Sequence, residues 1–417
     1  MKSNRLKIVS LLISVMMFVF SSVAYAQVTL TVWEWDMNER PEAVQAIVKA
    51  FEEENPDIKI KIETIDWNSM EQKSVLAGEA GAMPDCLEIS PVWMQTLAKR
   101  GYLEDLAPFI EKEEEGFIED YVVATKDPWT NTYSYLPWRM NVHGLYMVED
   151  YVKEAGFAEP PKTWEEFEEV AKKCTVDLDG DGKIDRYGFV CNTPNNNFAL
   201  KLFCSFGVQF ENPDGTSGLA SSKAIEAMEY WSKIEKNYGP PEMAMFGFKE
   251  SRDVFMSGKA AITAEGSWMN TILATGMLPG LTWQPFRTPI YDVPTAIVGA
   301  EMYGIGKGTK YPEEAWKFLK FITGPEADAI LIKMSKGIPG HKVNTAIPEV
   351  QADPLIKIFA DEVAEAQRVE FFESYKTWAA YNELHPNIYQ QILYGQMTVE
   401  EAMKELARQI DEATVKD

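Results

Sequence analysis

Short strand patterns and amphipathic helix patterns alternate along the chain from residue 28 onward. The first strand is predicted over 28–33. A helix follows from Pro41, with apolar residues three and four positions apart, and Asn55-Pro56 ends it. The next segment, 58–65, alternates apolar and polar residues and predicts a second strand. Strand–helix–strand units of this kind pack as a mostly parallel sheet with helices on both faces, so we predict an α/β fold.

The alternation continues through the rest of the chain, less regularly in the middle. Thr163 and Glu166 have the spacing of a capping box, so a helix is expected to begin at Thr163. The other predicted helices cover 69–80, 92–100, 224–238, 312–322, 354–368 and 399–413, and the other predicted strands cover 86–89, 133–146, 186–190, 260–264 and 295–305.

Length and charge limit the domain organisation and the partners. The chain has 417 residues, more than one hydrophobic core usually holds, so two lobes are expected. No low-complexity linker separates them, which favours several crossings of the chain between the lobes. The sequence contains 40 Lys and Arg against 64 Asp and Glu, a net charge of −24. This acidity argues against nucleic acid and against anionic membrane surfaces, because both are bound mainly through Lys and Arg.

The first 26 residues have the pattern of a secretory signal peptide. Lys2, Arg5 and Lys7 form a basic start, an apolar run covers 8–23, and Ala24-Tyr25-Ala26 is a small-x-small cleavage site. We therefore expect a periplasmic protein that begins at Gln27 after cleavage. No cysteine stands at the cleavage point and no later segment is long and apolar enough to span a bilayer, so no direct membrane anchor is expected.

Four cysteines, Cys86, Cys174, Cys191 and Cys204, leave two alternatives open. Export permits oxidation, and Cys174 and Cys191 bracket a turn-rich loop that a disulfide could close. Alternatively, all four are buried thiols that pack as small apolar side chains.

Several catalytic and nucleotide-binding motifs are missing. The sequence has no GxGxxG, and the segment 306–309 lacks the upstream glycine of a phosphate loop. The three histidines form no HExxH pattern, and no GxSxG elbow is present. The 64 acidic residues offer many carboxylate pairs of the kind that hydrolases use, but no feature of the sequence distinguishes one pair from the others. The sequence favours a binding protein over an enzyme, with no required cofactor.

Tryptophan is abundant, with 12 residues, and several follow directly after predicted strands. Ligands of open α/β sheets collect at the carboxyl ends of strands. An indole covers the apolar face of a sugar ring, while carboxylates, amides or guanidinium bind its hydroxyls. The alternative role for any one tryptophan is packing in the hydrophobic core. This role is predicted for Trp164, Trp231 and Trp316, which lie inside helix patterns. Trp67 precedes a helix, and its role is left undecided. Suitable groupings are Glu34, Trp35 and Asp36; Trp138, Arg139 and Asn141; and Glu265, Ser267 and Trp268.

An acidic, glycine-rich loop covers residues 177–185. Aspartates at its positions 1, 3, 5 and 9 with glycine at position 6 match the first part of a calcium-binding loop, although position 12 is Gly188 instead of a bidentate glutamate. A bare hairpin turn is the alternative. If Ca²⁺ binds, its role is structural and the predicted ligands are Asp177, Asp179, Asp181, Lys183 through its backbone carbonyl, and Asp185.

Several segments, in order, resemble the family 1 extracellular solute-binding proteins, which are the sugar-binding subunits of bacterial ABC importers and include maltose-binding protein. The resemblance covers nearly the whole chain after the signal peptide. Residues 146–147 read Tyr-Met where the family usually has Tyr-Asn. The segments that carry the resemblance are 30–33, 51–56, 83–87, 97–106, 136–139, 144–146, 161–167, 256–261 and 315–321.

The family implies the type II periplasmic binding protein fold, in which two α/β lobes enclose a ligand cleft. It implies an N-terminal lobe of 27–137 and 287–340, and a C-terminal lobe of 138–286 and 341–417. A monomer of this kind captures a sugar or oligosaccharide by hinge closure and delivers it to the membrane permease of an ABC importer. Such a protein is not an enzyme.

Transferred position by position, the resemblance implies a ligand-binding set drawn from both lobes. The positive charge of Arg139 is compatible with an anionic sugar as the ligand, and the many acidic residues are compatible with a cationic solute. The alternatives are the same fold binding a polyamine or a polyol phosphate, and a secreted polysaccharide hydrolase. The implied ligand-binding residues are Glu34, Trp35, Asp36, Ser90, Trp93, Trp138, Arg139, Asn141, Glu265, Trp268, Glu301, Tyr303 and Trp378.

Overall fold

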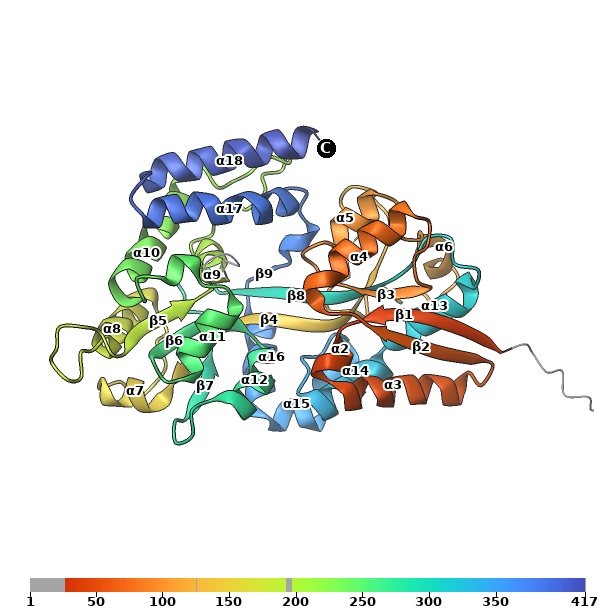
Figure 1. Cartoon of the computed structure of the whole chain (residues 1–417), viewed down its shortest axis with the longest axis horizontal. Helices are drawn as coiled ribbons and strands as arrows, with labels where there is room; N and C mark the ends of the chain where they lie inside the picture. The colour runs from red at the N-terminus through yellow and green to blue at the C-terminus, as the bar shows by residue number, and fades with distance from the viewer. Residues whose placement is uncertain (1–26, 125, 193–196, 417) are drawn as a thin grey trace, which may run out of the picture.

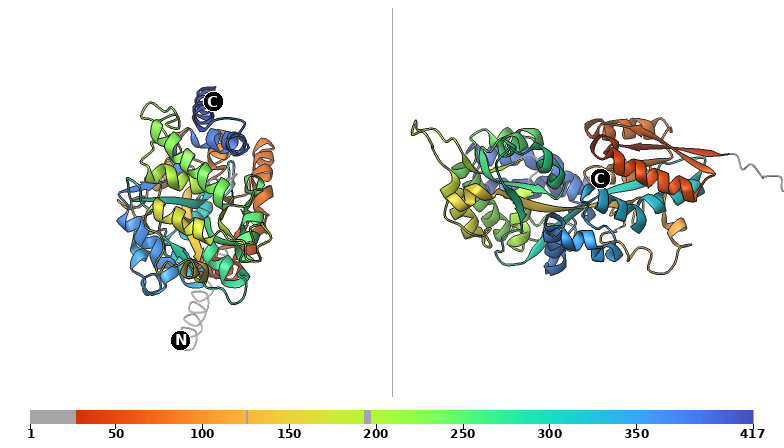
Figure 2. Two further views of the ribbon diagram at one scale, coloured as in Figure 1. Left: turned by 90° about the vertical axis from the view of Figure 1, so that its left-hand side faces the viewer. Right: turned by 90° about the horizontal axis from the view of Figure 1, so that it is seen from below.

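Two α/β lobes lie side by side and share one mixed sheet in the computed structural model, which describes residues 27–124, 126–192 and 197–416 (Figure 1). The two longest strands, β4 (Leu136–Val148) and β8 (Thr295–Ile305), run from one lobe into the other and pair antiparallel. The view from below shows the same two strands between the lobes (Figure 2). The lobes are therefore joined by paired strands.

The N-terminal lobe is built on β1 (Val28–Glu34). This strand pairs in parallel with β2 (Ile58–Thr64) and β3 (Cys86–Ile89), and β3 pairs antiparallel with β8. Helix α3 (Pro41–Glu54) has proline in its first turn and buries one apolar face, on which Phe51 packs edge-on against Phe318 with ring centroids 5.2 Å apart. As a result, the carboxyl ends of β1, β2 and β3 meet at one edge, which faces the other lobe (Figure 1).

The C-terminal lobe continues the same sheet. Strand β4 pairs antiparallel with β6 (Ala260–Gly266) and with β7 (Trp283–Phe286), and β5 (Tyr187–Cys191) pairs in parallel with β6. Strand β9 (Arg368–Glu370) pairs in parallel with β8. The resulting strand order is β2-β1-β3-β8-β4-β6-β5, and parallel and antiparallel pairs both occur in it.

Helices cover both faces of the sheet (Figure 1). The remaining elements are α2 (Asp36–Glu39), α4 (Trp67–Glu79), α5 (Met94–Lys99), α6 (Ala107–Ile110), α7 (Glu149–Glu154), α8 (Trp164–Cys174), α9 (Asn197–Ser205), α10 (Ser222–Tyr238), η1 (Met243–Met245), α11 (Phe248–Met256), α12 (Met269–Gly276), α13 (Pro312–Ile322), α14 (Pro325–Ser335), η2 (Lys342–Ala346), α15 (Pro348–Ala352), α16 (Pro354–Glu365), η3 (Phe372–Ser374), α17 (Trp378–Leu393) and α18 (Val399–Lys416).

The predicted fold class and most predicted elements are confirmed. At α8, the Thr163 hydroxyl accepts a hydrogen bond from the Glu166 backbone N–H at 3.2 Å, and the Glu166 carboxylate accepts from Lys162 instead of closing on Thr163. The helix predicted over 354–368 ends at Glu365, because its last residues enter β9. Helix α17 was not predicted, since Pro386 interrupts its sequence pattern.

The possible Cys174–Cys191 disulfide is absent: all four cysteines are buried free thiols. The Cys174 thiol instead donates to the Tyr151 carbonyl at 3.6 Å. Among the described residues, no helix is long and apolar enough to cross a bilayer. The signal peptide predicted over residues 1–26 lies outside the described residues, and the predicted lobe boundaries stay a prediction.

Candidate functional site

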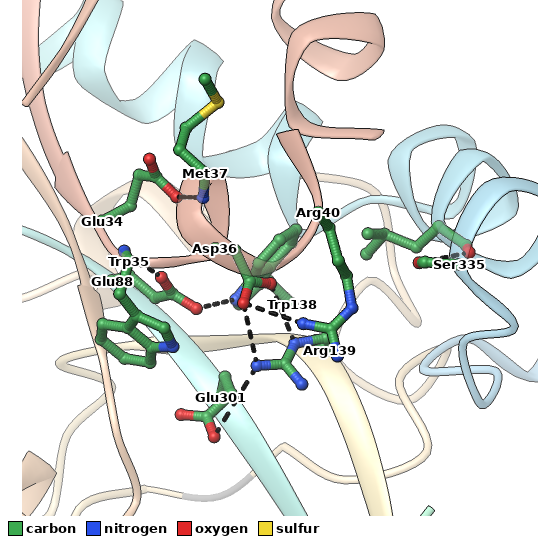
Figure 3. Close-up of polar contacts among 11 residues, drawn as sticks. Glu34, Trp35, Asp36, Met37, Arg40, Glu88, Trp138, Arg139, Glu301 and Ser335 are labelled. Atoms are coloured by element: carbon green, nitrogen blue, oxygen red, sulfur yellow. Dashed lines mark hydrogen bonds and ion pairs between the residues drawn. The ribbon is translucent and has the colours of Figure 1, made fainter. Parts of the chain in front are cut away.

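A cluster of acidic side chains lies at the carboxyl edge of the N-terminal lobe, where β1 and β3 end (Figure 3). Glu34 is the last residue of β1, Asp36 opens α2, and Glu88 lies inside β3; all three are almost completely buried. Glu301 of β8 completes the set and its side chain is mostly buried. We call these four residues the acidic cluster. Its position between the lobes makes it the centre of the candidate site.

Asp36 holds two guanidinium groups within the cluster. Its Oδ1 accepts from Arg40 Nη1 at 2.9 Å and from Arg139 Nη2 at 3.3 Å, and its Oδ2 lies 3.2 Å from Arg139 Nε. Arg139 Nη2 also lies 4.0 Å from Glu301 Oε1. Because Arg139 belongs to β4 and Asp36 to α2, this network ties the strand between the lobes to the N-terminal lobe.

Glu88 is a central member of the site that sequence analysis missed. Its Oε1 accepts from the Trp138 indole N–H and its Oε2 from the Trp35 backbone N–H, both at 3.0 Å. A glutamate inside the short, fully buried strand Cys86–Ile89 was the signal that could have identified it. A buried acid needs such partners, so its presence there indicates a polar site.

The pKa values of two of these acids are raised. Burial, and to a lesser extent the charge of Asp36, raises the pKa of Glu34 to about 7. Burial together with the charges of Asp36 and Glu301 raises the pKa of Glu88 well above its usual range, despite nearby Arg139. One oxygen of Glu34, Oε1, is buried without a hydrogen-bond partner in the described structure, so this carboxyl has an oxygen left for a ligand hydroxyl.

A narrow pocket opens between the lobes next to the acidic cluster. It is lined by Arg40 of the N-terminal lobe, by the β4 segment 139–141, by Ser267, Trp268 and Thr271 of the C-terminal lobe, and by the segment 335–338. We call it the interlobe pocket. The segment 335–338 was not predicted to line the site. It starts at the end of α14, and Ile338 reaches the pocket because it pairs with Met140 of β4.

The C-terminal wall of the interlobe pocket is fixed by Glu265. Its carboxylate pairs with Arg252 through two contacts of 2.9 and 3.1 Å, and it also accepts from the Trp268 indole N–H at 2.8 Å. The Trp268 ring is half-buried and its neighbour His143 packs edge-on, with ring centroids 5.5 Å apart. Glu265 is therefore engaged within the protein and serves to orient Trp268, the ring that lines the pocket.

Five of the six aromatic rings expected at the ligand lie in packed cores instead, and among them Trp35 and Trp93 are 3% and 2% exposed. Trp138 and Tyr303 contact each other edge-on at 5.5 Å and are 2% and 1% exposed. Trp378 stacks on Phe372 with centroids 5.6 Å apart. Their ring faces are covered by other side chains in this structure. Of the other expected residues, Glu34, Asp36 and Glu301 belong to the acidic cluster, Arg139, Asn141 and Trp268 line the interlobe pocket, Glu265 bonds Trp268, and Ser90 directly follows β3.

The acidic loop forms a turn stabilised by its own backbone. Carboxylate oxygens of Asp177, Asp179 and Asp185 lie within 4.8 Å of one another, which suits a hard cation. Asp177 also accepts from the Gly180 and Gly182 backbone N–H groups at 2.7 and 2.8 Å. Asp181 pairs with Lys183 at 3.2 Å and lies outside this carboxylate group. The donors therefore fit the predicted ion in part, and a structural Ca²⁺ remains a prediction.

If that prediction holds, thermal unfolding will depend on calcium. Replacing EGTA by millimolar CaCl₂ is expected to raise Tm by a few degrees, because an ion that binds only the folded state stabilises it. Asp177→Asn should abolish the shift, whereas Asp214→Asn, in another exposed loop, should keep it. Equal Tm values in both buffers would contradict calcium binding.

Comparison with known proteins identifies the family. The model of the bacterial extracellular solute-binding proteins matches residues 34–329, which is more than half of the chain. The chain belongs to this family. The match begins at Glu34 of the acidic cluster and includes β4, β6 and β8, so it covers most of the candidate site.

Individual relatives are similar over most of their length. A putative binding protein of Brucella abortus is 25% identical over 403 residues, 94% of each chain. The maltotriose-binding protein of Pyrococcus abyssi is 23% identical, over 81% of this chain and 72% of its own. A solved ABC substrate-binding protein of Listeria monocytogenes, in complex with cycloalternan, has a TM-score of 0.78 at 22% identity, covering 93% of this chain and 99% of that one. The last likeness supports the two-lobed fold.

Proposed function

We propose that this solute-binding protein captures a sugar or oligosaccharide in the interlobe pocket by closure of the lobes, and delivers it to the permease of an ABC importer. The observation that carries the proposal is the lining of the pocket. It brings the half-buried Trp268 ring of the C-terminal lobe together with Arg139 and Asn141 of β4 and with Arg40 of the N-terminal lobe.

This lining matches the chemistry of a saccharide. The indole face covers the apolar C–H face of a sugar ring, while the amide, hydroxyl and guanidinium groups hydrogen-bond its rim. Ligand that contacts both lobes at once stabilises the closed arrangement, because those contacts are complete only there. Binding and closure are thus one event, and the closed form is the one presented to the permease.

The charge balance favours an uncharged ligand. Asp36 pairs with both Arg40 and Arg139 and offsets part of their positive charge, which makes them weaker partners for a phosphate than unpaired arginines are. Burial raises the pKa of Glu34 to about 7 and that of Glu88 well above its usual range, which disfavours the negative charge that would attract a polyamine. A neutral carboxyl both donates and accepts hydrogen bonds, which suits hydroxyl groups.

Catalysis is not part of the proposed function. The family is one of solute-binding proteins. Two acids of the site are used within the protein: Asp36 pairs with Arg40 and Arg139, and Glu88 accepts from Trp35 and Trp138. The expected product of an encounter with ligand is therefore a complex with intact ligand.

Isothermal titration calorimetry with maltose, maltotriose and mannotriose, followed by chromatography of the recovered sugar, tests this function. Saturable binding with recovery of the unchanged saccharide is the expected result. Release of shorter sugars would show a hydrolase, and absence of binding to any saccharide would contradict the proposal.

Trp268→Ala is expected to weaken saccharide binding about tenfold or more, since it removes the stacking face and its buried area, at more than about 1 kcal/mol. Trp283→Ala is the matched control, because Trp283 is also half-buried in the C-terminal lobe but lies on β7, outside the pocket lining. Calorimetry of both variants makes the comparison. Equal affinity of wild type and Trp268→Ala would place the ligand elsewhere.

A further inference from the structure

A hydrogen-bonded contact joins the two lobes outside the strands β4 and β8. The side-chain amide of Gln95, on α5, donates to the backbone carbonyl of Tyr375 at 2.9 Å, and its Oε1 accepts from the Trp129 indole N–H at 3.1 Å. Gln95 is only 4% exposed, so the contact is closed to solvent. Tyr375 lies between η3 and α17, 280 residues further along the chain. We call Gln95, Trp129 and Tyr375 the interlobe contact.

The N-terminal lobe supplies its side of the contact through a turn that Asp127 stabilises. Asp127 is fully buried, and its Oδ1 accepts from the backbone N–H groups of Trp129 and Thr130 at 3.0 and 2.8 Å. Its Oδ2 accepts from the Tyr135 hydroxyl at 3.1 Å, which ties the turn to the residue before β4. The Lys99 ammonium of α5 lies 4.2 Å from the centroid of the Trp129 ring. The turn and α5 therefore belong to one packed surface of the N-terminal lobe.

Tyr375 is anchored in the C-terminal lobe. Its ring stacks on Phe210 with centroids 5.8 Å apart, and its hydroxyl donates to Glu370 of β9 at 2.8 Å. Two residues further on, the backbone N–H and the hydroxyl of Thr377 both donate to Glu211 at 2.9 Å. Phe210 and Glu211 lie between α9 and α10. The carbonyl that Gln95 binds therefore moves with the C-terminal lobe.

The position of the contact makes it sensitive to the arrangement of the lobes. In Figure 1, α5 and the start of α17 lie opposite each other at the top of the view. A hinge movement in β4 and β8, the paired strands that run between the lobes, would carry these two sides apart. Water would then replace the lost hydrogen bonds, so the net stabilisation by the contact is modest. Such a contact favours closed lobes without preventing their opening.

We infer that the interlobe contact stabilises the closed arrangement of the lobes, with Gln95 as its positioning residue, and thereby raises the affinity for the ligand. The effect on affinity rests on the proposed function, in which only closed lobes contact the ligand from both sides. The effect on the arrangement of the lobes does not depend on a ligand. A ligand that requires closed lobes binds with an apparent affinity proportional to the closed fraction of the protein.

Gln95→Met tests this inference, because methionine has a similar volume but cannot donate to the Tyr375 carbonyl. In closed lobes that carbonyl then lacks its buried donor, whereas water supplies one in open lobes, so the variant should favour opening. Spin labels at Leu76→Cys of α4 and Lys404→Cys of α18 report the distance between the lobes. Both positions are 58% exposed, and the four native cysteines are buried. Without any saccharide, pulsed electron paramagnetic resonance should give a larger share of long distances in Gln95→Met than in the labelled parent.

Gln390→Met is the matched control. Gln390 also donates to a backbone carbonyl, that of Ala244 at 3.1 Å, but both residues belong to the C-terminal lobe. This variant should keep the distance distribution of the labelled parent. Trp129→Phe keeps a ring beside Lys99 but lacks the N–H that Gln95 accepts, so it should shift the distances in the same direction as Gln95→Met and by less.

Calorimetry gives the second readout. For the best bound of maltose, maltotriose and mannotriose, Gln95→Met is expected to bind about fivefold or more weakly than wild type, and Gln390→Met should bind like wild type. Equal distance distributions in Gln95→Met and the labelled parent would overturn this inference, as would equal affinities, and either result would leave the proposed function standing. Absence of saccharide binding to wild type would overturn the proposed function, and the distances would still test the hold of the contact on the lobes.

Discussion

Asp36→Asn is expected to lower the free energy of unfolding by about 3 kcal/mol, because it leaves two buried guanidiniums without their shared carboxylate. Asp36 is fully buried and contacts Arg40 and Arg139 at 2.9 to 3.3 Å. Glu301, 4.0 Å from Arg139, is too distant to replace it at both groups. Urea unfolding followed by tryptophan fluorescence measures the loss.

Asp253→Asn is the control for this substitution. Arg40 and Asp36 are one helical turn apart, and so are Lys249 and Asp253, but the second pair is exposed to solvent. Surface pairs of this kind contribute little, so the control should unfold at the wild-type urea concentration. If Asp36→Asn also kept the wild-type midpoint, the network at Asp36 would not hold the site together.

Glu34→Gln is expected to stabilise the protein by about 2 to 3 kcal/mol at pH 8 and to have little effect near pH 4.5. The pKa of Glu34 is raised to about 7 in the folded protein, mainly by burial, whereas an unfolded glutamate titrates near 4.5. Between these values the folded state holds a proton that the unfolded state has lost. Stability therefore falls as the pH rises from about 4.5 to 7, and glutamine removes this loss.

Glutamine also preserves the acceptor that Glu34 Oε2 offers to the Met37 backbone N–H at 3.0 Å, so the substitution changes charge more than structure. Urea unfolding of wild type and variant at pH 5 and pH 8 gives the comparison. Glu53→Gln, at a 69% exposed position of α3, is the control and should follow the wild type. A variant that loses stability equally at both pH values would contradict a raised pKa.

Sequence patterns identified the fold and one side of the site. The strand–helix alternation predicted β1, β2, β3 and the helices between them, since apolar periodicity reports directly on which face of an element is buried. The residues that follow β1, Trp35 and Asp36, were found for the same reason: the end of a strand can be read from the sequence.

The remaining side of the site depends on features that local sequence does not carry. The pairing of β4 with β8 is irregular between Pro137 and Arg139. At this β-bulge, consecutive residues both reach acids of the N-terminal lobe: Trp138 bonds Glu88, and Arg139 bonds Asp36. From the sequence, the Trp138 ring was expected to contact the ligand. In the structure, its ring is buried and its indole N–H donates to Glu88 inside the core.

Long-range partners were missed for a related reason. Arg252 was not singled out from the sequence, and the packing of α11 on β6 brings it to Glu265. Tyr303 lies two residues beyond Glu301 on β8 but reaches the Phe318 core, because α13 covers that end of the strand. Such contacts follow from tertiary packing, which a single sequence does not specify residue by residue.

A thermal-shift screen of the protein from Gln27 onward tests the central claim most directly. Its ligands are glucose, maltose, maltotriose, mannotriose, galacturonate, spermidine and glycerol 3-phosphate. At about 100 times its Kd, a ligand adds about 2.7 kcal/mol to the folded state, which appears as a rise of a few degrees in Tm. A rise with one class of saccharide, and none with spermidine or glycerol 3-phosphate, is the predicted result. A rise with spermidine or glycerol 3-phosphate alone would contradict saccharide capture in the interlobe pocket.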